Sequence, residues 1–121
     1  MEPAAKKGIY RFPKRERLKK KAEIKAVFAN RRQVSYTGSK LFFMKNGLEH
    51  NRIAITFTRK YGSAVERNRT RRVYREAYRL LRPSFRHGWD LVLLIYPGHD
   101  SDKKEMAARF RMLLSRAKVL I

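Results

Sequence analysis

Seven arginines lie in the 23 residues between Lys60 and Arg82. An arginine side chain presents a planar fork of donors that can bridge phosphate oxygens, and its plane can stack on a base. Because so many guanidinium groups would repel one another in isolation, their density indicates a partner with crowded phosphates, and a folded RNA fits best. A solvated charged surface is the alternative. Phosphate contacts supply affinity without sequence information, whereas Asn68 can contact a base edge or fix the first turns of a helix.

An amphipathic helix is predicted to carry these arginines. Ser63 and Glu66 form a capping-box pattern at its start, and Pro83 ends it. At about 100° per residue, one side collects Thr70, Val73, Ala77, Leu80 and Leu81, with Tyr74 at its edge. The opposite side collects Asn68, Arg71, Arg72, Arg75, Arg79 and Arg82, with Arg67 on one flank. Glu76 can pair with Arg72 one turn earlier.

Groups suited to catalysis by the protein itself are sparse. His50, His87 and His99 fall in predicted loops without the spacing of a metal-binding motif. Glu66 and Asp102 already have predicted roles as helix caps, so no set of carboxylates converges as a two-metal nuclease requires. The chain contains no cysteine and no phosphate-binding loop signature. We expect no catalytic residue and no metal site in the protein alone, with a histidine pair that cleaves RNA as the alternative.

The length and composition of the chain limit the classes of protein to which it can belong. The chain has 121 residues, a formal net charge of +21 and 43% hydrophobic residues, which together predict one folded domain with a polyanionic partner. Neither an apolar run of about 18 residues nor a signal-peptide pattern is present, so a cytoplasmic location is expected. Residues 1–13 lack periodicity and are predicted to form a flexible arm before a single domain at 14–121.

Other elements must hold the arginine helix in place. Helical spacing predicts a first helix from about Lys20 to Asn30, in which Ile24 and Phe28 either pack in the core or line a cleft where bases stack. Residues 41–44 and 52–58 are predicted strands joined as a hairpin, since Asn46-Gly47 is a strong turn signal. Alternation within 52–58 places Thr56 and Thr58 on a small polar face, which is either an accessible binding surface or an ordinary solvated one.

The C-terminal third completes an α+β pattern. The apolar run at 91–96 predicts a strand buried on both faces and parallel to 52–58. Asp102 and Glu105 then start a last helix with a buried stripe at Met106, Phe110, Leu113, Ala117 and Leu120. The order helix–hairpin–helix–strand–helix predicts a two-layer α/β sandwich.

The segment from Lys60 to Glu76 resembles a known signature. It matches the pattern K-x-G-x-A-V-x-R-N-R-x-[KR]-R-x-x-R-E of the protein subunit of bacterial ribonuclease P. The resemblance extends to the R-L-K-K helix near the start and to the W-D-L-V strand, and covers about residues 14–115. Two departures stand out: Ile24 occupies a position that is usually aromatic, and Arg31 one that is often glycine.

The resemblance implies a protein cofactor of an RNA enzyme. The catalytic RNA would remove the 5′ leader of precursor tRNA in a Mg²⁺-dependent reaction, with one protein per RNA subunit. The residues implied to dock on that RNA are Arg67, Asn68, Arg69, Arg71, Arg72, Arg75 and Arg79. The implied leader cleft comprises Ile24, Phe28, Thr56, Thr58 and Lys60, and further RNA-facing basic residues are Arg17 and Lys20. A ribosomal or general RNA-binding protein is the alternative.

The resemblance also implies a particular fold. The strand–helix–strand crossover would be left-handed, as in the second domain of a small-subunit ribosomal protein. That handedness opposes the strong preference for right-handed crossovers.

Overall fold

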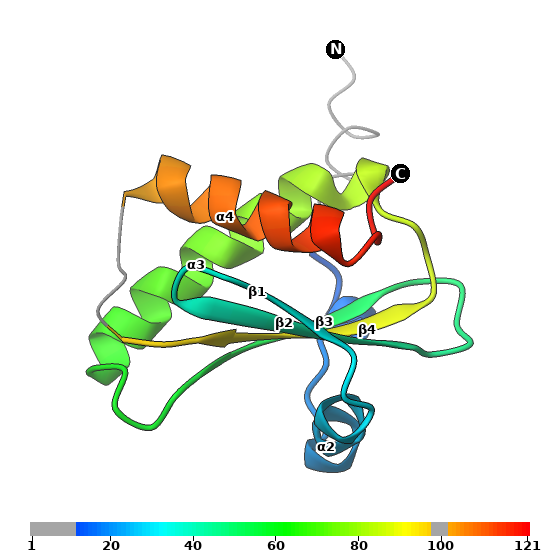
Figure 1. Cartoon of the computed structure of the whole chain (residues 1–121), viewed down its shortest axis with the longest axis horizontal. Coiled ribbons are helices and arrows are strands. Elements are labelled where there is room, and N and C mark those ends of the chain that lie inside the picture. Colours follow the sequence, from blue (N-terminus) through cyan, green and yellow to red (C-terminus); the bar gives the residue numbers. More distant parts are fainter. Residues whose placement is uncertain (1–11, 98–101) are drawn as a thin grey trace.

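A computed structural model describes residues 12–97 and 102–121, so nearly all of the predicted N-terminal arm lies outside the described residues. Within these described residues, three α-helices and four strands follow one another with two short 3₁₀ turns, and Figure 1 shows their arrangement. In chain order they are η1 (Lys14–Glu16), α2 (Lys21–Ala29), β1 (Gln33–Tyr36), β2 (Ser39–Lys45), β3 (Arg52–Phe57), α3 (Ala64–Leu81), η2 (Arg82–Ser84), β4 (Trp89–Ile95) and α4 (Lys103–Arg116). Among the described residues, no helix is both long and apolar enough to span a bilayer.

The four strands form one mixed sheet in the order β1-β2-β4-β3. β4 pairs antiparallel with β2 and parallel with β3, which confirms the predicted central buried strand. α3 and α4 cover one face of the sheet as the predicted two-layer sandwich, and α2 covers part of the other face (Figure 1). In the same view β3 is the far edge of the sheet, so the connection from β3 through α3 to β4 is left-handed.

The predicted pairing of residues 41–44 with 52–58 is wrong, because β4 lies between β2 and β3. The hairpin partner of β2 is instead β1, which pairs with it antiparallel. The Asn46-Gly47 turn does not reverse the chain onto β2. Asn46 instead binds the backbone of Leu48 and His50, and so shapes a loop that passes across the start of β4.

Two apolar clusters hold the layers together. The larger lies between the sheet and the α3–α4 layer, and the smaller packs Val27 of α2 against Ala54 and Val92. The buried stripe of α3 differs from the predicted one, since Tyr78 is fully buried whereas Leu80 is 54% exposed. Tyr78 packs against Phe85 with ring centroids 4.9 Å apart, and the buried face of the helix is the one that carries Tyr74 and Tyr78.

The exit of α2 has a backbone conformation that favours glycine. Arg31 follows the helix with φ of 65°, a left-handed conformation that glycine adopts at little cost. The backbone therefore keeps the glycine geometry although the residue is arginine.

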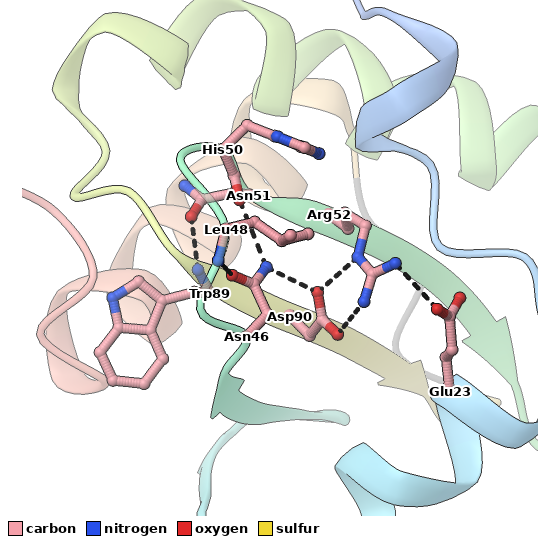
Figure 2. Close-up of polar contacts among 8 residues, drawn as sticks. All are labelled: Glu23, Asn46, Leu48, His50, Asn51, Arg52, Trp89 and Asp90. Carbon is pink, nitrogen blue, oxygen red and sulfur yellow. Dashed lines mark hydrogen bonds and ion pairs between the residues drawn. The ribbon is translucent and has the colours of Figure 1, made fainter.

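A polar network ties α2 to the sheet (Figure 2). The Arg52 guanidinium donates to both carboxylate oxygens of Asp90, at 2.8 and 2.7 Å, and to Glu23 of α2 at 3.0 Å. Asn46 adds a hydrogen bond to Asp90 at 2.9 Å, and Asn51 accepts from the Trp89 amide at 2.8 Å. The network spans β3, β4 and α2, and so sets the position of α2 beside β3.

Candidate nucleic-acid interface

The capping box at the start of α3 is present as predicted. The Ser63 hydroxyl accepts from the Glu66 amide, and the Glu66 carboxylate accepts from the Ser63 amide, both at 3.2 Å. Hydrogen bonds with Ser63 hold the pKa of the Glu66 carboxyl below its usual value. These bonds fix where the helix begins and therefore which arginines point toward β3.

The arginines of α3 separate into two groups. Arg71 and Arg75 face the edge of β3, where they line a pocket together with Arg17, Ile24 and Thr56. Arg69 and Arg72 instead line a groove on the side of α4. One helix thus presents two cationic surfaces, one of them beside the predicted leader cleft.

Aromatic rings support the guanidinium groups of the β3 side. The Arg71 guanidinium lies 5.1 Å from the ring centroid of Phe57. Those of Arg17 and Arg75 lie 5.0 and 5.8 Å from the Phe12 centroid. Such cation–π contacts restrain the side chains while the donor N–H groups can still bind an anion.

This cluster has unsatisfied positive charge. Burial, followed by the charges of Arg17 and Arg71, lowers the pKa of Arg75. Of these cations, Arg17 has a buried Nε with no hydrogen-bond partner in the described part of the chain. A phosphate group at this place would relieve the repulsion and accept from free donors.

The predicted cleft residues are only partly brought together. Ile24 and Thr56 line the pocket with Arg17, and the Thr56 hydroxyl donates to the Leu93 carbonyl at 3.1 Å. Phe28 is half-buried on the next turn of α2 and packs edge-on against Phe42 at 4.7 Å. The remaining predicted residues are half-buried Thr58 after β3, exposed Lys60 before α3, and exposed Lys20 at the start of α2.

Other residues of the predicted docking face make local contacts. Arg67 donates to the Arg59 carbonyl at 3.0 Å, and Asn68 accepts from Arg71 at 3.2 Å. Glu76 pairs with Arg79 at 2.5 Å, so the expected pairing with Arg72 is replaced by a contact three residues ahead. Arg72 stays exposed as a result.

Arg82 does not belong to the RNA-facing set of α3. Its guanidinium pairs with Glu16, which is only 3% exposed and also accepts from the Tyr78 hydroxyl at 2.6 Å. Burial tends to raise the pKa of Glu16, but the hydrogen bonds from Arg82 and Tyr78 outweigh it, so the pKa is lowered. Burial and the same carboxylate raise the pKa of Tyr78.

The predicted histidines do not form a metal site in the described part of the chain, which holds no group of three potential metal-ligating side chains. His50 and His87 line one pocket with Glu49, at the end of the sheet where the Arg82–Glu16 pair lies. His99 lies outside the described residues.

The contacts of Phe12 and Phe57 with arginines were not predicted from the sequence. Phe57 lies half-buried at the end of β3, where it packs against the larger core cluster. Only the β3–α3 connection, which returns Arg71 over its ring, reveals the contact.

The fold and the cationic surfaces of α3 define a small basic α+β protein that binds RNA. A family model described as "Ribonuclease P" matches residues 12–118. The ribonuclease P protein component of Dictyoglomus thermophilum is 37% identical over 93 residues, covering 77% of this chain and 78% of the relative. The ribonuclease P protein component of Natranaerobius thermophilus is 33% identical over 104 residues, which cover 85% of this chain and 90% of the relative. The chain therefore belongs to the ribonuclease P protein family, whose members are subunits of an endoribonuclease that processes tRNA.

Solved structures agree with this fold. The RNase P protein of Thermotoga maritima superposes with a TM-score of 0.75 at 26% identity, covering 83% of this chain and 98% of that chain. The RNase P protein of Staphylococcus aureus superposes with a TM-score of 0.80 at 23% identity, covering 88% of this chain and 98% of that chain.

Proposed function

We propose that this chain is a non-catalytic cofactor that binds the catalytic RNA of ribonuclease P and the 5′ leader of precursor tRNA. The observation that carries the proposal is the pocket in which Arg17, Arg71 and Arg75 meet Ile24 and Thr56. Cations for phosphates and an apolar wall for bases lie together there, as a loosely specified single strand requires.

The division of α3 supports two simultaneous contacts. Arg69 and Arg72 point away from the leader pocket and remain exposed for the catalytic RNA. Arg71 and Arg75 line the leader pocket on the other side of the same helix. The helix would therefore hold the leader against the RNA enzyme, so that leader binding adds to substrate affinity.

In this proposal the catalytic RNA binds Mg²⁺ and performs the hydrolysis. The protein contributes by bringing basic groups to crowded phosphates, which lowers the repulsion between substrate and RNA subunit. We further propose one protein per RNA subunit and a cytoplasmic location.

Cleavage of precursor tRNA at low Mg²⁺ tests the proposal, with RNA subunit alone, protein alone, and both. Cleavage is expected to require the RNA subunit and to increase strongly when the protein is added. Cleavage by the protein alone would instead favour a protein nuclease, and replacement of His50 and His87 by alanine would then abolish it. Absence of stimulation would favour a general RNA-binding protein.

A further inference from the structure

A groove between α3 and the first turn of α4 carries a cationic surface that extends beyond the family signature. Arg69 and Arg72 line it from α3, and Lys103 and Lys104 line it from α4. All four side chains are exposed. The two helices that form the groove come from opposite sides of β4 in the chain, so the signature segment alone does not contain this surface.

The groove has an apolar floor. Val73, Ala77 and Ala107 line it together with Leu80, which is 54% exposed. A large apolar side chain that projects between cations suits the ribose and base faces of a nucleic acid strand, while the cations suit its phosphates. The floor therefore distinguishes this groove from a uniformly solvated basic surface.

Among the described residues, Glu76 is the one carboxylate that lines the groove, and Arg79 already pairs with it at 2.5 Å. The hydrogen bond from Arg79, and after it the charges of Arg79 and Lys103, lower the pKa of Glu76. Arg69, Arg72 and Lys104 are left to attract a polyanion.

We propose that a strand of the catalytic RNA lies along this groove, with phosphates at Lys103 and Lys104 and a sugar or base over Leu80. The inference rests on the proposed function and extends the RNA contact from α3 to α4. Continuity with Arg69 and Arg72 of the docking helix favours RNA over a protein partner.

Paired charge reversals test the proposal. Lys103→Glu with Lys104→Glu changes the groove, whereas Arg111→Glu with Lys118→Glu changes exposed residues of α4 and its C-terminal end that lie outside the groove lining. Both pairs lower the net charge equally. Binding to the RNA subunit is measured at several salt concentrations. The groove pair is expected to weaken binding about tenfold more than the control pair, and to reduce the slope of log K against log salt by roughly 1.4–1.8.

A separate variant tests the floor. Leu80→Ala is expected to weaken RNA binding severalfold without changing the salt slope, because it removes apolar contact but no charge. Circular dichroism checks that each variant is folded. The proposal is overturned if the two charge-reversed pairs weaken binding equally, if Leu80→Ala has no effect, or if sedimentation shows that the groove pair dissociates a protein dimer. Failure of the unaltered protein to bind the RNA subunit would refute the proposed function instead.

Discussion

The two ion pairs of Arg52 test how burial affects the contribution of an ion pair to folding stability. Asp90 and Glu23 both bind the Arg52 guanidinium (Figure 2). The Asp90 side chain is 3% exposed, whereas the Glu23 side chain is 33% exposed. Asp90→Asn and Glu23→Gln each replace a carboxylate by its nearly isosteric amide. The two variants therefore remove the same charge from the same cation at different depths.

The expected magnitudes differ severalfold. Breaking a buried ion pair by neutralising one partner costs about 3–5 kcal/mol, because the other charge stays buried and uncompensated. Asn keeps one acceptor oxygen and Glu23 still pairs with Arg52, so the lower end of that range, about 3 kcal/mol, is expected for Asp90→Asn. Solvent screens the Glu23 pair, and about 0–1 kcal/mol is expected for Glu23→Gln. Against a total stability of about 5–15 kcal/mol, only the first change is severe.

Urea denaturation measures both variants. Trp89 is the only tryptophan of the chain and adjoins Asp90, so its fluorescence reports the opening of this region, while far-UV circular dichroism reports the helices. With a slope of about 1–3 kcal/mol per molar urea, the midpoint should fall by about 1–3 M for Asp90→Asn. For Glu23→Gln it should fall by less than about 1 M. Equal losses in the two variants would refute the argument from burial, as would an Asp90→Asn protein as stable as the original.

Three further predictions follow from the described contacts. Arg71→Ala with Arg75→Ala should weaken binding of precursor tRNA that carries a 5′ leader and reduce its log–log salt slope by about 1.4; an unchanged slope would contradict a phosphate role. Arg31→Gly should raise the free energy of unfolding by about 0.5–1 kcal/mol in urea titrations, since φ of 65° costs arginine more than glycine; a less stable variant would contradict this. The pKa of Glu16 is lowered in the folded protein. Its contribution to folding stability is therefore complete above the pKa that Glu16 has in the unfolded chain, and it is lost as the pH falls through the pKa of the folded state. Glu16→Gln should therefore flatten the acid side of the stability–pH curve, and an unaltered curve would contradict the ion pair.

Local chemistry made much of the molecule predictable. The capping box of Ser63 and Glu66 and the cap at Asp102 set the starts of α3 and α4, because those bonds join residues three apart. The apolar run of β4 predicted a strand buried on both faces, since only such a strand avoids polar positions. The ordered signature at 60–76 predicted the family.

Contacts between residues far apart in the sequence determined the features of the fold and site that local patterns did not predict. The alternation of apolar and polar residues does not show which strands become neighbours, so it did not predict that β4 lies between β2 and β3. Arg82 looked like another RNA-facing arginine until the fold brought Glu16 to it across 66 residues. The arginine helix itself was evident from the sequence. Its division into a leader side and an α4 side depends on where β3 and α4 pack against it, which only the tertiary structure determines.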